Sequence, residues 1–362
     1  MVKKYADLLT SYCLNVKPGQ KVLVRTSTLA EPFVKALYAS LLKRGAFVEF
    51  QLSFEDQETI FYAHAEDAQL EHVSDFYQLA AKNYDKLISI QAPFNLKSTS
   101  AVPLDVRMKA QKNMAPTKKI IMDRSANKEL EWVLCVYPTQ SMAQEAGMSL
   151  PDYQRFVYNA CLLDHTNPAE AWGRVSKFQQ RIVDVLNTKS LIRYVTKGTD
   201  ISFSTKGRTW VNSDGKRNMP SGEVFTSPVE DSVDGVVSFS FPSIHGGREI
   251  TGVRLVVEKG KVVSWTADSG QDYLDYIFTI PGANVFGEAA IGLNDGIQKM
   301  TKNILFDEKM GGSVHMAVGA SYPETGGKNT SSVHWDMITD MKESGQIFAD
   351  GDMIYEKGKF LF

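Results

Sequence analysis

The chain has 362 residues, of which 43% are hydrophobic, so it is longer than one hydrophobic core usually organises and two domains are expected. The formal net charge of −2, with basic residues scattered along the chain, excludes the electrostatic footprint of a nucleic-acid or membrane-surface protein, and no apolar run approaches the ~20 residues of a membrane span. Cys13, Cys135 and Cys161 lie far apart without CxxC spacing, which argues against disulfides and thiolate zinc sites and favours a reducing cytoplasm.

The first half alternates strand and helix patterns. Charges at Lys3, Lys4 and Asp7 interrupt the apolar residues of the N-terminus, which favours an amphipathic helix over a signal peptide. Strand patterns follow at 19–27, 46–53, 85–92, 118–124 and 130–139, and helix patterns at 29–43, 67–82 and 104–112. This order predicts an open α/β sheet. The motifs GxGxxG, GxxxxGK and GxSxG are missing, so we interpret this half as structural, or as shaping access to a site elsewhere.

The second half has a different character. Residues 151–164 and 168–188 predict two helices, and from Leu191 alternating and β-branched runs are broken by glycine turns. One helix is expected at about 287–299, and a last hairpin turns at Asp350-Gly351. The sequence therefore predicts an N-terminal α/β domain (1–188) and a C-terminal β-rich α+β domain (189–362).

Residue types that bind metal concentrate between Pro281 and Asp336. Two of the six histidines, His315 and His334, lie there on short strand patterns beside glycines. His334 and Asp336 are two positions apart, so on an extended segment both side chains project to the same side. Each histidine taken alone has an alternative to a role as metal ligand. His315 could be a hydrogen-bonded core residue, and His334 could lie in a surface turn.

Three glutamates are further candidates. Glu223 stands at a turn held by Pro220 and Gly222, and Glu288 is expected at the start of a helix of small residues with its carboxylate inward. Glu308 precedes His315 by seven positions, with Asp307 beside it. A solvated carboxylate is the ordinary alternative for each of them.

Tyr322 could supply a hydroxyl to a developing oxyanion, although a half-buried structural tyrosine is the ordinary alternative. The other histidines, His64, His72, His165 and His245, have no carboxylates clustered around them in the sequence, and His245 is interpreted as part of a turn. HExxH is missing, which excludes a zincin arrangement.

These residues lie in ordered blocks: YADLLTSYCLNVKPGQKVLV, NMPSGEVFTSP, GEAAIGLN, FDEKMGGSVHMAVGASYP and HWD. In this order, over nearly the whole chain, the blocks resemble the thermophilic aminopeptidase family of dinuclear metallo-aminopeptidases, the aminopeptidase T, aminopeptidase S and PepS type. The resemblance implies a homodimer that acts on short peptides.

The resemblance also implies roles for individual residues. Two divalent ions would be held by Glu223, Glu288, Glu308, His315, His334 and Asp336. Glu288 would bridge the ions, and Tyr322 would be the catalytic tyrosine. Apart from the resemblance, a bridging carboxylate such as Glu288 could also relay a proton to the leaving amine, and other carboxylates of the set are open alternatives for that role. A carboxylate and imidazole set suits zinc, cobalt, manganese or magnesium.

Two other functions remain open from the sequence. A dinuclear hydrolase of another amide or ester would use the same residues, and a non-catalytic protein could bind a small ligand in its α/β half. Peptides with free and blocked amines separate the first alternative from the aminopeptidase, and Glu288→Gln, which would leave a binding protein unaffected, tests the second.

Overall fold

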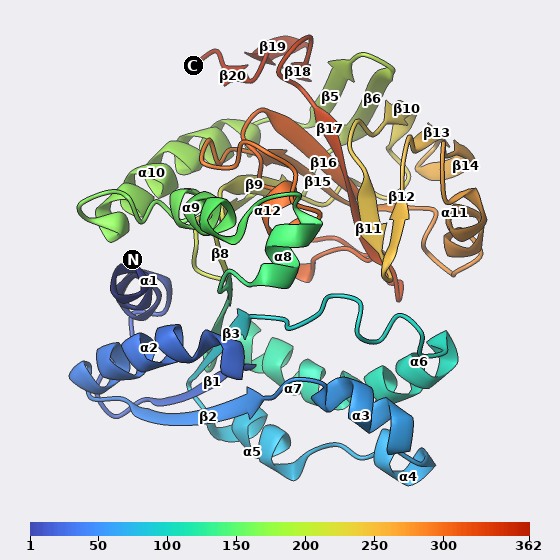
Figure 1. Cartoon of the computed structure of the whole chain (residues 1–362). Coiled ribbons are helices and arrows are strands. Elements are labelled where there is room, and N and C mark those ends of the chain that lie inside the picture. The colour runs from blue at the N-terminus through green and yellow to red at the C-terminus, as the bar shows by residue number, and fades with distance from the viewer. The chain divides into compact units, whose positions relative to one another are not determined.

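The computed structural model describes residues 1–103, 105–110 and 112–362, and the chain folds into two compact units (Figure 1). Unit 1 contains residues 1–169 and 215–220, and unit 2 contains residues 170–214 and 221–362. This division differs from the expected boundary after residue 188. Most of the long helix before that boundary belongs to unit 2, because its residues Ile182 and Leu186 are buried in the core of unit 2.

Unit 1 is the open α/β sheet that the sequence predicts. Its strands are all parallel, in the order β2-β1-β3-β4-β8. The strands are β1 Lys21–Ser27, β2 Phe47–Ser53, β3 Lys86–Gln91, β4 Glu131–Val136 and β8 Asn218–Met219. The helices are α1 Val2–Leu8 with a π-helical continuation Leu9–Cys13, a 3-10 turn Thr28–Ala30, α2 Glu31–Lys43, α3 Gln57–His64, α4 Asp67–Leu70, α5 Asp75–Asn83, α6 Leu104–Asn113, α7 Ala115–Ala126, α8 Gln140–Glu145 and α9 Leu150–Ala160.

Helices cover both faces of this sheet. Val22, Leu23 and Val24 of β1 are all completely buried, as expected for a strand of a parallel sheet. Leu23 packs with Tyr77 and Ala80 of α5, and α2 lies on the opposite side (Figure 1).

Two expectations for unit 1 were wrong. Residues 118–124 form part of helix α7 rather than a strand, because their apolar run is short, Pro116 opens the helix and Lys119 pairs with Asp123 one turn later at 2.9 Å. The single helix expected at 67–82 is divided into α4 and α5, and Ser74 caps the second of these by accepting a hydrogen bond from the backbone N–H of Tyr77.

Unit 2 is built from two large β-sheets, one two-stranded sheet and three α-helices. The larger sheet has the order β14-β13-β10-β6-β5-β18-β19-β20, the smaller one β17-β16-β15-β9-β7, and β11 pairs with β12. The strands are β5 Leu191–Thr196, β6 Thr199–Ser204, β7 Val211–Ser213, β9 Glu223–Thr226, β10 Asp234–Ser238, β11 Ser243–His245, β12 Arg248–Ile250, β13 Arg254–Glu258, β14 Lys261–Thr266, β15 Phe286–Gly292, β16 Ser313–Gly319, β17 His334–Asp340, β18 Gln346–Ala349, β19 Asp352–Glu356 and β20 Lys359–Phe360. The helices are α10 Pro168–Leu186, α11 Gln271–Ile277 and α12 Ile304–Asp307, with a 3-10 turn Pro323–Thr325.

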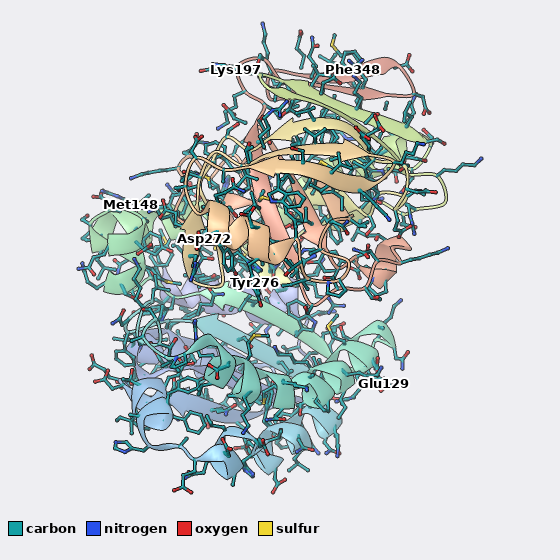
Figure 2. The ribbon with its side chains drawn as sticks, turned by 90° about the vertical axis from the view of Figure 1, so that its right-hand side faces the viewer. Glu129, Met148, Lys197, Asp272, Tyr276 and Phe348 are labelled. Carbon is teal, nitrogen blue, oxygen red and sulfur yellow. The ribbon has the colours of Figure 1, made fainter. Side chains whose placement is uncertain are left out.

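One hydrophobic core joins the two sheets of unit 2. It contains Ile201 and Leu255 from the larger sheet and Ile291 and Met316 from the smaller one. The surface helix α11 adds Leu274 and turns Asp272 and Tyr276 outward (Figure 2). The smaller sheet is therefore anchored through one face, which leaves its other face available for polar side chains.

The hairpin predicted at Asp350-Gly351 is present as β18 and β19. The helix expected at 287–299 is wrong, because residues 286–292 form the central strand β15 between β16 and β9. Its two alanines favour a helix in isolation, but pairing on both sides and complete burial override that propensity. In the part of the chain that the structure describes, no helix combines the length and apolar character needed to cross a membrane.

Candidate metal centre

The register of the smaller sheet places the candidate ligands on one face. Directly paired residues of antiparallel strands share a face, and Ala317 of β16 pairs with both Glu288 of β15 and Asp336 of β17. The other pairs that continue this face are Gly292 with Glu223, Ala290 with His315, and Gly319 with His334. Four strands thus present five candidate ligands together, although up to 113 positions separate them in the sequence.

Small residues separate the candidate ligands on this face. Ala290, Gly292, Ala317 and Gly319 carry at most a methyl group, so the long side chains beside them have room to converge. The alternate residues of the same strands, including Val314 and Met316, point into the hydrophobic core. The period of two along each strand therefore separates the polar face from the core.

A β-bulge at Gly287 directs Glu288 to this face. The register shifts between Phe286, which pairs with Val318, and Glu288, which pairs with Ala317, so Phe286 joins the core while Glu288 faces the polar side. Gly287 has no room for a side chain, because a Cβ there would lie 2.1 Å from the carbonyl oxygen of Ala320.

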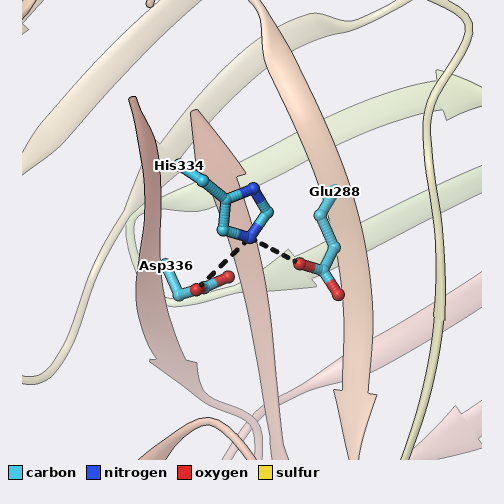
Figure 3. A group of neighbouring side chains, drawn as sticks. All are labelled: Glu288, His334 and Asp336. Carbon is cyan, nitrogen blue, oxygen red and sulfur yellow. Dashed lines mark ion pairs between the residues drawn. The ribbon is translucent and has the colours of Figure 1, made fainter. Parts of the chain in front are cut away.

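One ligand group consists of Glu288, His334 and Asp336 (Figure 3). His334 Nε2 lies 3.1 Å from Glu288 Oε2 and 3.5 Å from Asp336 Oδ2. Its Nδ1–H donates to the carbonyl oxygen of Ala320 at 2.8 Å, which leaves the lone pair on Nε2 for a ligand and fixes the ring.

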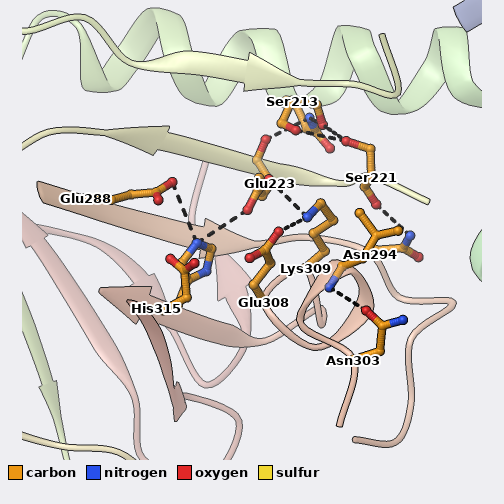
Figure 4. Close-up of polar contacts among 12 residues, drawn as sticks. Ser213, Ser221, Glu223, Glu288, Asn294, Asn303, Glu308, Lys309 and His315 are labelled. Atoms are coloured by element: carbon orange, nitrogen blue, oxygen red, sulfur yellow. Dashed lines mark hydrogen bonds and ion pairs between the residues drawn. The ribbon is translucent and has the colours of Figure 1, made fainter. Parts of the chain in front are cut away.

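A second group consists of Glu308, His315 and Asp336, so it shares Asp336 with the first group. Glu223 adjoins it, with Oε2 3.4 Å from His315 Nε2. Lys309 lies on the far side of these carboxylates, paired with Glu308 and 3.5 Å from Glu223 Oε1 (Figure 4).

Helix α10 holds the backbone at Glu223. Gln179 is completely buried, and its Nε2 donates to the carbonyl oxygens of Glu223 at 3.1 Å and of Ser213 at 3.0 Å. These bonds tie the edge of the sheet, β7 and β9, to the helix.

Several buried polar atoms here lack hydrogen-bond partners among the described residues. This is unusual, because nearly all buried polar atoms in native proteins are hydrogen-bonded. The atoms in question are Glu223 Oε2, His315 Nδ1 and Nε2, His334 Nε2 and Asp336 Oδ1. Carboxylate oxygens and imidazole nitrogens are the atoms that divalent metals bind. The donor set and its unsatisfied atoms therefore fit a metal ion.

The charges of the group are strongly coupled. Burial disfavours ionised Glu288, but the adjacent imidazoles of His315 and His334 overcome this and lower its pKa to about 2. Burial opposes charge on the imidazoles too, but the neighbouring carboxylates raise the pKa of His315 to about 9 and of His334 to about 10. Burial raises the pKa of Asp336 to about 7. In the metal-free site, protons on the imidazoles thus supply positive charge.

Tyr322 lies at the edge of this group. Its ring contacts those of His334 and Phe225 edge-on, with centroids 5.0 and 5.4 Å apart. Burial, and then the negative charge of Glu288, raise the pKa of Tyr322 well above its usual value. The phenol therefore keeps its proton at neutral pH and can donate a hydrogen bond.

The structure brings together all the site residues that the sequence singled out. Asp307, the neighbour of Glu308, lies apart from the ligand groups, where its Oδ1 accepts hydrogen bonds from the N–H and hydroxyl of Thr301. The sequence reasoning missed Lys309, for which the only signal was its position next to Glu308. It also missed the contacts of His245. The His245 ring stacks on Trp335, with ring centroids 5.2 Å apart, and its Nδ1 forms a hydrogen bond with the hydroxyl of Tyr273.

Comparisons with known proteins agree with this architecture. The family model described as thermophilic metalloprotease (M29) matches residues 1–360. The chain is 28% identical to aminopeptidase 2 of Geobacillus stearothermophilus, over 99% of this chain and 97% of that protein. It is 27% identical to aminopeptidase AmpS of Bacillus subtilis, over 99% and 98%. The solved structure of AmpT from Thermus thermophilus matches the fold with a TM-score of 0.88 and 22% identity, over 100% of this chain and 99% of that one.

Proposed function

The chain belongs to the thermophilic metalloprotease family M29, and from this membership we propose that it releases N-terminal amino acids from short peptides by means of two divalent metal ions. It is a metal-dependent aminopeptidase, as its aminopeptidase relatives over nearly the full chain indicate. The number of ions, the substrate length and the residue roles are our proposals.

The observation that carries the two-ion proposal is the pair of ligand groups that share Asp336. Glu288, His334 and Asp336 would hold one ion, and Glu308, His315 and Asp336, with Glu223, would hold the other. Glu288 supports this reading, since its Oε1 lies 3.8 Å from His315 Nε2 and its Oε2 lies 3.1 Å from His334 Nε2. One carboxylate thus faces both groups, as a bridging ligand would.

A divalent ion lowers the pKa of the water it binds towards ~7 and polarises a carbonyl oxygen, which makes peptide hydrolysis feasible at neutral pH. The residues of the chain would supply the rest. Tyr322 donates a hydrogen bond to the oxyanion, since its pKa keeps it protonated. A carboxylate of the site accepts the proton of the water and returns it to the leaving amine, and Glu288 is our candidate. The donor set suits zinc, cobalt, manganese or magnesium.

The test is hydrolysis of aminoacyl arylamides and of short peptides with free or acetylated amines, before and after thorough chelation. We expect activity on free amines only, lost on chelation and restored by added metal. Equal cleavage of acetylated peptides would instead favour a hydrolase of another amide or ester. Activity that survives metal removal would contradict the proposal.

We further propose a cytoplasmic homodimer. Family membership supports the dimer, and light scattering coupled to size-exclusion chromatography tests it. Three buried free thiols, Cys13, Cys135 and Cys161, support a reducing compartment.

A further inference from the structure

Lys309 is a cation built into the candidate metal centre. It follows α12 in the turn that leads to β16, and its side chain is completely buried. Its ammonium pairs with Glu308 Oε1 and lies 3.5 Å from Glu223 Oε1. A buried ammonium is stable only when carboxylates compensate its charge. The position of Lys309 therefore depends on these two side chains.

The contacts of Lys309 involve only one side of the centre. Glu223 turns Oε1 to Lys309 and Oε2 to His315. The ammonium thus adjoins the group of Glu308, His315 and Asp336, and it pairs with Glu308 of that group. Around Glu288 and His334, the described residues form no ion pair with a lysine or arginine; there the ion pairs join only imidazoles and carboxylates. Only the second group, which also has Glu223 beside it, therefore has an ammonium in contact with its carboxylates.

We propose that Lys309 makes the affinities of the two metal positions unequal. The tighter position is the group of Glu288, His334 and Asp336, and the weaker position, whose ion exchanges, is the group of Glu308, His315 and Asp336. The inference rests on the proposed function, because it requires that both groups bind metal. Its physical basis is repulsion between the fixed ammonium and a divalent ion on the adjoining carboxylates, which buried surroundings screen far less than water does.

Lys309 would also have a positioning effect. By holding one oxygen of Glu223 and one of Glu308, it keeps carboxylates from β9 and from the end of α12 in place before metal arrives. Without the ammonium, the two carboxylates would repel each other in the metal-free protein but would attract a second ion more strongly. The charge of Lys309 thus lowers the affinity of this group for metal and stabilises the site when it is empty.

The test is calorimetric titration of the metal-stripped full-length protein with Mn²⁺. For the unaltered chain we expect two classes of binding, with dissociation constants at least tenfold apart. Lys309→Met keeps the aliphatic length but removes the charge, and should tighten the weaker class at least tenfold while the tighter class moves less. Lys309→Arg should keep the classes apart. Lys197→Met, a change of an exposed lysine between β5 and β6 (Figure 2), should leave both classes unchanged.

Two equal classes in the unaltered chain, or a weaker class that Lys309→Met leaves unchanged or weakens further, would overturn the inference. Should Lys309→Met fail to fold, Lys309→Gln, which removes the charge but keeps a hydrogen-bond donor for the two carboxylates, replaces it in the titration with the same expected result. Failure of the proposed function would give a different result. The metal-stripped chain would then bind no Mn²⁺ in the titration, or it would keep its peptidase activity. Two equal classes together with metal-dependent activity would overturn only the role of Lys309.

Discussion

At the scale of single residues, Glu288 occupies the central position, since its two carboxylate oxygens face different imidazoles. Glu288→Gln keeps its shape but removes the negative charge that both groups need. We expect kcat/KM to fall by more than about 100-fold and the metal content to drop, because direct ligands matter at least as much as the groups that orient them. Metal analysis and arylamide kinetics measure both.

The matched control for this change is Glu343→Gln, which alters an exposed glutamate of the same unit. It should leave both quantities unchanged. Unaltered activity in Glu288→Gln would rule out the bridging role.

Tyr322 permits a second change at this scale. Tyr322→Phe removes only the hydroxyl, while the ring contacts with His334 and Phe225 remain. If the phenol donates to the oxyanion, kcat should fall by about 10²–10³-fold, with KM and metal content nearly unchanged. Steady-state kinetics on a metal-loaded sample decide this, with Tyr276→Phe on the surface of α11 as the control. A change in KM alone would assign Tyr322 to substrate binding instead.

At the scale of elements, the bulge in β15 determines whether Glu288 faces the site. Gly287→Ala would place a Cβ 2.1 Å from the carbonyl oxygen of Ala320, which the strand can relieve only by shifting against β16. We expect a loss of about 1–3 kcal/mol in the free energy of unfolding, with weaker metal binding because Glu288 is displaced. Urea unfolding with and without metal measures both effects.

The control for the bulge is Gly173→Ala in helix α10, where a Cβ would meet no atom within 4 Å. It should be neutral or stabilise by about 0.5–1 kcal/mol, since alanine favours a helix. If Gly287→Ala behaved in the same way, the bulge could not be what fixes the register of Glu288.

At the scale of the whole molecule, metal binding should depend on pH. The pKa values of about 9 for His315 and about 10 for His334 mean that both imidazoles are protonated at pH 7 in the metal-free protein. Ligation requires neutral imidazole, so binding must release protons, and the apparent affinity should rise with pH up to about these values. Titration calorimetry in buffers of different ionisation enthalpy measures the protons released. Heats that do not depend on the buffer would contradict this charge state.

Metal should also stabilise the fold as a whole. An ion that binds only the folded protein adds about 2.7 kcal/mol to the free energy of unfolding at a concentration 100 times its dissociation constant. Chelation should therefore lower the melting temperature, and added metal should raise it in proportion to the logarithm of its concentration. A melting temperature unaffected by chelation would mean that the purified protein carried no metal.

Much of the fold could be predicted from local patterns. The apolar run of β1 and the stripe of α2 indicate burial directly, so the strand and helix order of unit 1 is largely readable in the sequence. The failures at 118–124 and 287–299 lie where short apolar or alanine-rich runs suit either structure. There the neighbouring elements decide, and a linear pattern does not contain them.

The sequence by itself determined which side chains are available for chemistry: two histidines, an aspartate and several glutamates near glycine turns, in blocks that resemble a metallopeptidase family. Only the tertiary structure decided that they meet. The pairing order of the smaller sheet and the bulge at Gly287 bring Glu223, Glu288 and His334 to one face, and the turn after α12 buries Lys309 beside them. Register and burial arise from contacts between segments far apart in the chain, so no spacing along the sequence could have specified them.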